Sequence, residues 1–169
     1  FGDHPRAFVK IQDGCNSRCS YCIVPFARGA SRSRPAGEVR RQMDLLVSRG
    51  YREIVLTGVH LGMWGRDLSP SDSLAALLRS LITIPGLERL RLSAIEPKEF
   101  SPALLDILSS DRICPHLPIP LQSGSAKILR AKRRPHTPKR YDALIAELTD
   151  RPPHNGIGAH VIVGLPGEE

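Results

Sequence analysis

Short apolar runs alternate with segments of helical periodicity along the chain, and this alternation constrains the fold most. The runs expected to form strands are residues 7–11, 53–57, 87–92, 117–121 and 158–163. The segments expected to form helices are residues 36–49, 71–82, 101–108 and one that opens at Thr137-Pro138. Strands joined by helices in this way pair in parallel, so the pattern predicts an α/β fold, a partial parallel (βα) barrel with about five βα units.

Helix-capping residues sharpen this prediction at three places. Ser71 or Asp72 is expected to cap the second helix, and Gly50 is placed to end the first. Gly124-Ser125 is suited to cap a further helix after the fourth strand. Enzymes with parallel α/β sheets carry their chemistry at the carboxyl ends of the strands, so functional residues are expected just after each strand.

Length and charge set limits on the class of protein. The 169 residues fit one domain spanning positions 1–169, and 24 Lys+Arg against 17 Asp+Glu give a formal charge of +7. A basic balance indicates a polyanionic partner only weakly, because a solvated basic surface explains it as well. No apolar stretch reaches the roughly 18 residues of a membrane span, and the start FGDHPRAFVK lacks the apolar core of a signal peptide. We therefore expect a cytoplasmic protein without a membrane segment.

Three of the four cysteines stand together, directly after the first expected strand: Cys15, Cys19 and Cys22. Three thiolates this close indicate a shared metal or cluster, because a disulfide framework cannot use an odd number. Structural zinc would need a fourth ligand such as Cys114, His60 or His116. A four-iron cluster with one iron left open needs no fourth protein ligand. Cys114 itself is expected to be a small buried residue.

The spacing Cys-x-x-x-Cys-x-x-Cys, with an aromatic residue before the last cysteine, resembles the signature of the radical S-adenosylmethionine (SAM) enzymes. Further segments resemble the methylthiotransferase family among them, in the same order along the chain: GCNSRCSYCIVPFARG (14–29), SRSR (31–34), LTGVHLG (56–62), SAIEP (93–97), PLQSGS (120–125) and VIVGLPGE (161–168). The segments 56–62 and 93–97 most resemble the branch that modifies threonylcarbamoyladenosine in tRNA.

This resemblance implies a radical SAM barrel with a 4Fe-4S cluster whose open iron binds SAM. The reduced cluster would cleave SAM to a 5′-deoxyadenosyl radical, and a methylthio group would be added to C2 of the adenine beside the anticodon. It also implies a tRNA substrate and an electron donor such as flavodoxin or ferredoxin. The family's N-terminal domain with a second 4Fe-4S cluster and its C-terminal TRAM domain are not among these residues, so a central fragment is expected.

Several residues after the expected strands are assigned to SAM by the resemblance. Gly58 would lie against the methionine end, although a turn glycine is an equal alternative. Glu96 could accept hydrogen bonds from SAM, or be a solvated loop acid. Tyr21 is expected beside the cluster and the adenine, or in the core.

The fourth and fifth expected strands supply further candidates. Gln122 and Ser123 offer amide and hydroxyl groups suited to ribose. Val163 and Gly164 are expected to end the fifth strand, where the family lays backbone along the adenine.

Basic residues form the last group of candidates. The run 130–134 is either a solvated helix face or a loop in which Arg134 approaches the SAM carboxylate. Arg28, Arg32 and Arg34 are candidates for weak contacts to tRNA phosphates.

The chain departs from the family pattern at four positions, which are Pro118, Lys132, Arg133 and His136. These departures affect the SAM-carboxylate loop and the substrate-facing wall, but not the cysteines. Three alternatives therefore stay open: a methylthiotransferase acting on isopentenyladenosine tRNA or a ribosomal-protein aspartate, a non-catalytic zinc-stabilised nucleic-acid-binding module, and an inactive fragment.

Overall fold

Five parallel strands and one short antiparallel strand form two sheets in the computed structural model. It describes residues 6–168; residues 1–5 and Glu169, part of the expected domain, lie outside the described range. The strands are β1 (Arg6–Asp13), β2 (Arg32–Ser33), β3 (Glu53–Gly58), β4 (Arg89–Leu92), β5 (His116–Gln122) and β6 (Gly156–Val161).

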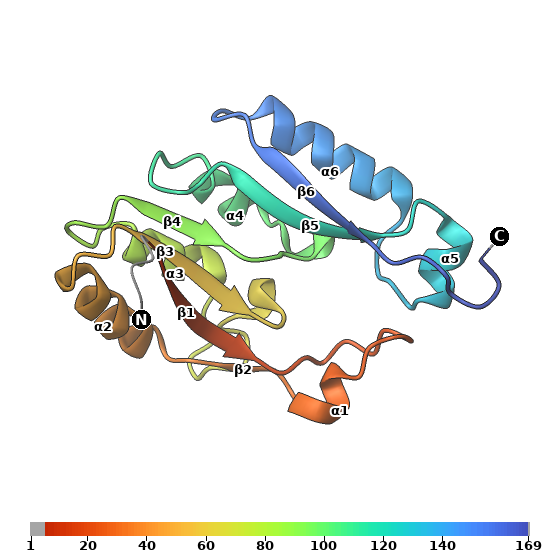
Figure 1. Ribbon diagram of the computed structural model, residues 1–169, viewed down its shortest axis with the longest axis horizontal. Coiled ribbons are helices and arrows are strands. Elements are labelled where there is room, and N and C mark those ends of the chain that lie inside the picture. Colours follow the sequence, from red (N-terminus) through yellow and green to blue (C-terminus); the bar gives the residue numbers. More distant parts are fainter. Residues whose placement is uncertain (1–5, 169) are drawn as a thin grey trace.

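The strands pair as two sheets that continue one curved surface (Figure 1). One sheet has the order β2-β1-β3-β4, with β2 antiparallel to β1 and the others parallel, and β5 pairs in parallel with β6. The two are linked by a parallel bridge between Leu90 and Ile113 and by a 3.1 Å hydrogen bond from Ile95 N to the Pro118 carbonyl. The carboxyl ends of all five parallel strands therefore meet along one edge, as expected for a partial (βα) barrel.

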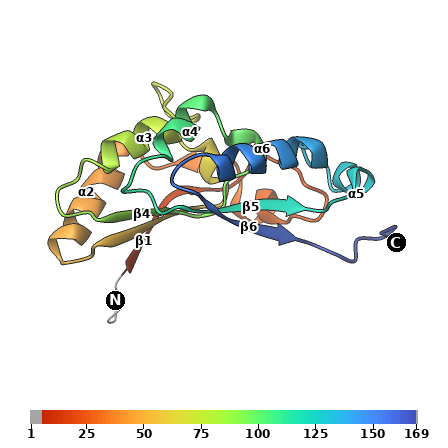
Figure 2. The same ribbon diagram turned by 90° about the horizontal axis from the view of Figure 1, so that it is seen from above.

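Helices cover one face of this curved sheet. They are α1 (Val24–Arg28), α2 (Ala36–Ser48), η1 (Leu61–Met63), α3 (Leu74–Leu81), η2 (Pro97–Glu99), α4 (Pro102–Ile107), α5 (Ala126–Ala131) and α6 (Pro138–Asp150). Figure 2 shows α2, α3, α4 and α6 on the same side of the strands. Between residues 6 and 168 no helix is both long and apolar enough to cross a membrane.

The core lies between the strands and these helices because alternate strand residues point toward the helices. On β1, Ala7 and Val9 are buried, whereas Phe8 between them faces the opposite side and is 61% exposed. The α2 side chains Val39 and Met43 are buried in the same core. Full burial of such a side chain stabilises the fold by roughly 1.5–3 kcal/mol.

The cap of α3 differs from the sequence-based expectation of Ser71 or Asp72. The helix begins at Leu74, and Ser73 caps it by accepting a hydrogen bond from Ala76 N at 3.2 Å. Asp72 stays outside the helix because its backbone N–H donates to the Gly65 carbonyl. The expected cap Ser125 is confirmed, because it accepts from the first turn of α5. Ser101 and Thr137, which open two of the expected helices, cap α4 and α6 in the same way.

The last strand is also shifted from its expected position. β6 covers Gly156–Val161 rather than 158–163, because it follows the register of β5 from His116 to Gln122. Val163 and Gly164 therefore follow the strand instead of ending it.

Candidate functional site

The three cysteines lie on the loop that connects β1 to α1, at the carboxyl edge of the sheet. Cys15, Cys19 and Cys22 are free and partly buried. Gly14 lets this loop turn away from β1: its φ is +70°, and a Cβ there would lie 2.1 Å from the Ala30 carbonyl oxygen. Cys15 N donates to the carbonyl of Gly29 at 3.1 Å, which closes the base of the loop.

Gln12 anchors the cysteine loop, and the sequence reasoning missed it. Its side chain is buried, and its Nε2 donates to the carbonyl of Gly14 at 2.7 Å and to Ser31 Oγ at 3.0 Å. Its Oε1 accepts from His60 N at 2.7 Å, which ties the cysteine loop to the loop after β3. The sequence carried no local signal for it, because strand alternation places Gln12 on the side of β1 that carries the exposed Phe8 and Lys10.

The cysteines are not gathered around a single point. In the described part of the chain, no three Cys, His, Asp or Glu side chains are placed to hold one metal ion. Cys114 is buried, as expected, and precedes β5 at the opposite end of the strands, where its N–H donates to Leu90 O. It therefore lies at the wrong end of the sheet for a fourth ligand. A four-iron cluster binds each thiolate at a separate iron.

Arg134 connects the cysteine loop to the loop after β4. Its side chain is 4% exposed and forms an ion pair with Glu96. Its Nη1 lies 3.5 Å from Cys19 Sγ and 3.4 Å from Tyr21 Oη. Burial would lower the pKa of Arg134, but Glu96 and Cys19 more than offset this and the pKa is raised. Burial raises the pKa of Tyr21 to about 12 against the effect of Arg134, so Tyr21 is a neutral phenol at pH 7.

The basic run 130–134 is not a uniformly solvated helix face. α5 ends at Ala131, and Lys132 is fully buried, with its Nζ donating to the Gln122 carbonyl at 3.0 Å and to the Ile162 carbonyl. Arg133 is exposed and adopts a left-handed φ of +54°. This reversal of the chain after α5 turns Lys132 and Arg134 inward, which residue type alone could not indicate.

The structure also shows where two of the residues that depart from the family pattern lie. His136 is buried, and its pKa is lowered by burial despite a contact of 3.1 Å between its Nε2 and the Leu121 carbonyl. Pro118 lies within β5, where its carbonyl accepts the hydrogen bond from Ile95. Both therefore support the β5 side of the site.

Gln122 and Ser123 lie at the carboxyl edge of the sheet, as the cysteine loop does, and both residues are buried. Gly58 also lies there, but a Cβ at Gly58 would meet Gln12 Oε1 at 3.0 Å, so protein packing accounts for this glycine. Val163 is 78% exposed, and Gly164 has open space around it. Val163 and Gly164 are therefore not packed against the cysteine loop.

Buried polar atoms without partners cluster at the carboxyl edge. In residues 6–168 these atoms are His60 Nε2, Ser93 Oγ, Glu99 Oε1, Gln122 Oε1, Arg134 Nε and His136 Nδ1. All six belong to the carboxyl end of a strand or to a connection that follows one. His60 Nε2 and Glu99 Oε1 lie 3.4 Å from each other. An unpaired buried polar group costs about 1–3 kcal/mol, so the concentration of the other four atoms here fits a bound polar ligand.

Two hollows open beside the cysteines. One, of about 250 Å³, is lined by Arg18, Cys19, Ser20, Cys22, Phe26 and Arg133. The other, of about 240 Å³, is lined by Cys15, Asn16, Arg18, Pro25, Gly29 and Ala30. Three thiols with open space beside them fit an iron–sulfur cluster, whose irons are held by cysteine sulfurs.

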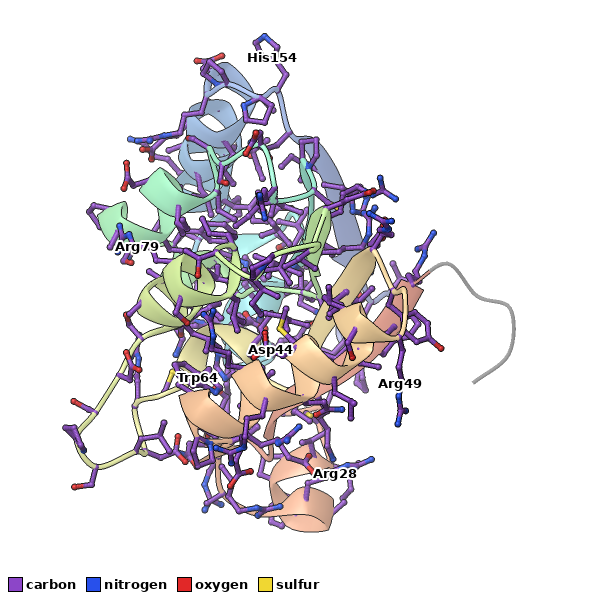
Figure 3. The ribbon with its side chains drawn as sticks, turned by 90° about the vertical axis from the view of Figure 1, so that its left-hand side faces the viewer. Arg28, Asp44, Arg49, Trp64, Arg79 and His154 are labelled. Carbon is purple, nitrogen blue, oxygen red and sulfur yellow. The ribbon has the colours of Figure 1, made fainter. Side chains whose placement is uncertain are left out.

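The arginines proposed to contact nucleic acid differ in exposure and in how many contacts they make within the chain. Arg28 is exposed at the end of α1 and pairs with Asp13 at 3.7 Å; Figure 3 shows it at the opposite end of the molecule from His154. Arg32 is exposed and donates to the Arg28 carbonyl. Arg34 is held by Gln42 Oε1, and its carbonyl accepts from the buried Trp64, so it is the least available.

This fold and this cysteine loop define a class of enzyme. Residues 9–169 match the radical SAM superfamily, and the chain belongs to that family. A 4Fe-4S cluster and SAM are therefore its cofactors, and the cysteine loop and the partnerless polar atoms are the residues that fit them.

Among curated relatives, the chain is 43% identical over 170 residues to the threonylcarbamoyladenosine tRNA methylthiotransferase MtaB of Bacillus subtilis, covering 99% of this chain and 38% of that protein. It is 40% identical over 164 residues to the tRNA-2-methylthio-N(6)-dimethylallyladenosine synthase of Alkaliphilus oremlandii, covering 96% of this chain and 35% of that protein. The chain thus spans little more than a third of each relative.

Solved structures share the fold. The radical S-adenosylmethionine methyltransferase TsrM from Kitasatospora setae, with cobalamin and a 4Fe-4S cluster bound, matches with a TM-score of 0.76 at 20% identity, over 96% of this chain and 32% of that one. The cobalamin-dependent S-adenosylmethionine radical enzyme OxsB matches with a TM-score of 0.73 at 14% identity, over 92% of this chain and 23% of that one.

Proposed function

We propose that this chain is the radical SAM core of a methylthiotransferase that adds a methylthio group to C2 of threonylcarbamoyladenosine in tRNA, next to the anticodon. The observation that carries the proposal is the three-cysteine loop at the carboxyl edge, facing the partnerless polar atoms of the neighbouring loops. The two curated relatives, both named as tRNA methylthio-modifying enzymes, support the reaction class.

The choice of branch rests on the segments 56–62 and 93–97. Relatives of the threonylcarbamoyl and the dimethylallyl branches match at 43% and 40% identity, so overall identity favours neither strongly. The structure supports a role for these segments because His60 lies beside Cys15 and Glu96 is paired with Arg134. Both segments therefore belong to the site rather than to the distant surface.

The protein residues would bind and orient the two cofactors. Cys15, Cys19 and Cys22 would hold the cluster, and SAM bound to it would supply the radical that removes hydrogen from the adenine. Arg134 would hold a carboxylate of SAM, while Glu96 fixes the guanidinium and accepts from the ammonium group. Gln122 and Ser123 would bind ribose, and Tyr21 would exclude water from the cluster.

We further propose that the backbone at Val163 and Gly164 lies along the adenine of SAM. Val163 is exposed and Gly164 has open space around it, which leaves room for a ligand beside them.

The partners follow from this reaction. The exposed Arg28 and Arg32 would contact tRNA phosphates, with a smaller part for Arg34. Flavodoxin or ferredoxin would deliver the electron, and a second 4Fe-4S cluster would be held by an N-terminal domain of the full-length protein. A tRNA substrate places the enzyme in the cytoplasm.

The full-length parent protein tests the proposal. It is reconstituted anaerobically with iron and sulfide and given SAM and reductant. Separate assays contain tRNA that carries or lacks the threonylcarbamoyl group, isopentenyladenosine tRNA, or the ribosomal protein. Mass spectrometry then identifies the modified nucleosides or peptides. Methylthiolation of only the threonylcarbamoyl tRNA is expected. Equal turnover of isopentenyladenosine tRNA, or modification of a ribosomal-protein aspartate instead, would overturn the branch assignment. A protein that binds zinc and no iron would support a nucleic-acid-binding module.

A further inference from the structure

A buried histidine lies directly against the first cysteine. His60 follows β3, is 6% exposed, and its Nδ1 lies 3.5 Å from Cys15 Sγ. The backbone N–H of His60 is held by Gln12 Oε1 at 2.7 Å, and Gln12 also holds the cysteine loop. The histidine and the sulfur are thus fixed to each other through a common buried residue.

The other side of the imidazole faces a buried carboxylate. The Glu99 side chain is 1% exposed, and its Oε1 lies 3.4 Å from His60 Nε2. Its Oε2 pairs with Arg66 Nη2 at 2.8 Å, and Lys98 Nζ lies 3.6 Å from its Oε1. The row Cys15–His60–Glu99–Arg66 runs from the cysteine loop to the surface.

This row requires a glycine at position 62. A Cβ on Gly62 would lie 2.5 Å from Glu99 Cβ and 2.7 Å from Glu99 Cγ. These are atoms near the backbone of Glu99, which cannot simply swing away. Glu99 therefore reaches His60 because position 62 carries no side chain.

We infer that His60 is a positioning residue that donates a hydrogen bond from Nδ1 to the Cys15 sulfur and thereby raises the reduction potential of the cluster. In this arrangement both ring nitrogens carry hydrogen, and the Nε2–H directed at the Glu99 carboxylate holds the ring in place. The inference rests on Cys15 being a cluster ligand, as in the proposed function. A thiolate bound to iron carries no proton, so it can only accept in this contact. Hydrogen bonds to cluster sulfurs stabilise the more negative, reduced state, which is one way a protein sets the potential.

The size of the effect follows from the strength of one hydrogen bond. A neutral hydrogen bond contributes about 1 kcal/mol, and a hydrogen bond to a charged group contributes more. Loss of the bond should therefore lower the ratio of reduced to oxidised cluster at a fixed potential roughly fivefold.

The test is an EPR-monitored redox titration of the full-length parent protein, reconstituted anaerobically and measured without tRNA. His60→Leu should keep its iron content, and the midpoint potential of the SAM-sensitive cluster should move to more negative values, while that of the second cluster stays unchanged. Trp64→Phe is the matched control, because Trp64 is buried at the end of the same loop but bonds to the Arg34 carbonyl instead of a cysteine. It should leave the potential unchanged.

A second measurement does not depend on the variant loading its cluster. In wild-type protein labelled with ¹⁵N-histidine, pulsed EPR of the reduced cluster should detect a ¹⁵N coupling. The same potential in His60→Leu and wild type, or no ¹⁵N coupling in wild type, overturns the inference. If His60→Leu modifies tRNA normally and its potential is unchanged, only this inference is overturned. If the wild-type parent protein binds no cluster, the proposed function is overturned as well.

Discussion

Two glycines with a left-handed backbone show how surroundings decide the role of a residue. Gly14 and Gly50 have φ values of +70° and +92°, but a Cβ on Gly14 would overlap the Ala30 carbonyl, whereas Gly50 has nothing within 4 Å. The first position holds the cysteine loop closed, and the second only ends α2. The sequence shows a glycine in both places and does not distinguish them.

Gly14→Ala and Gly50→Ala should therefore differ in cost. Gly50→Ala should lower the free energy of unfolding by about 1 kcal/mol, the cost of left-handed backbone. Gly14→Ala should cost at least about 2 kcal/mol more, since backbone atoms must move. Urea denaturation measures both, and equal midpoints for the two variants would contradict the assigned role of Gly14.

The pair of Arg134 and Glu96 should respond asymmetrically to truncation. Glu96→Ala leaves a guanidinium that is only 4% exposed without its carboxylate, at a cost of about 3 kcal/mol. Arg134→Met leaves the 21% exposed Glu96, which water can reach, and should cost about 1 kcal/mol. Thermal or urea unfolding gives the comparison, with the exposed Arg130→Met as control. A larger loss in Arg134→Met would argue against this reading of the pair.

At the scale of elements, one carboxylate joins three strands at the amino ends of the sheet. Glu53 on β3 accepts from Arg89 and Arg91 of β4, both at 2.9 Å, and lies 3.8 Å from Arg6 of β1. Burial would raise the pKa of Glu53, but the hydrogen bonds from the two β4 arginines more than offset it, and the pKa lies below its ordinary value.

The stability that Glu53 contributes should therefore depend on pH. A carboxyl whose pKa is lower in the folded state stabilises the fold above its unfolded pKa, about 4.3, and loses this contribution as the pH falls through the folded value. Glu53→Gln should cost about 1–3 kcal/mol at pH 7. The difference from wild type should shrink steadily below about pH 5. Unfolding curves at several pH values measure this, and a difference that grows in acid would contradict it.

Lys132 connects the end of β5 to the chain beyond β6. Lys132→Met removes its hydrogen bonds to the Gln122 and Ile162 carbonyls. The Ile162 amide, which donates to Gln122 O at 3.2 Å, should then exchange with solvent at least about fivefold faster, reflecting the loss of about 1 kcal/mol. Hydrogen exchange by mass spectrometry tests this, with the exposed Lys127→Met on α5 as control. Unchanged protection near Ile162 would refute the role of Lys132.

The elements show which part of the fold was predictable. Period-2 and helical patterns located the five parallel strands and the helices α2, α3, α4 and α6, because apolar spacing reports burial. The short helix α1 and the strand β2 were missed, since neither buries an apolar face that would leave such a pattern. The shift of β6 was missed because strand register depends on its partner β5.

The candidate site was predictable only where its residues lie close together in the sequence. The cysteines follow one strand, and their spacing alone indicates a shared metal or cluster. Gln12, Glu99 and the inward turn of Lys132 depend on contacts between distant loops, and no local pattern marks such contacts.

The whole molecule is a one-sided layer, with helices on one face of a curved parallel sheet (Figure 2) and the candidate chemistry along one edge. The ion pair between Glu53 and Arg89 stabilises the amino ends of the strands, whereas buried polar atoms without partners lie at the carboxyl ends. This division fits a scaffold at one end and a ligand site at the other, because unpaired buried groups are tolerated where a ligand pairs them.

The most direct test of the cluster is the EPR spectrum of the anaerobically reconstituted, reduced full-length protein, recorded with and without SAM. A 4Fe-4S cluster with an open iron predicts a component of the signal that changes when SAM is added. This SAM-sensitive component should be lost when Cys15, Cys19 or Cys22 is replaced by alanine, while the signal of the second cluster remains. A spectrum that SAM leaves unaltered, or a SAM-sensitive component that survives the loss of any of these cysteines, would contradict the three-cysteine cluster site.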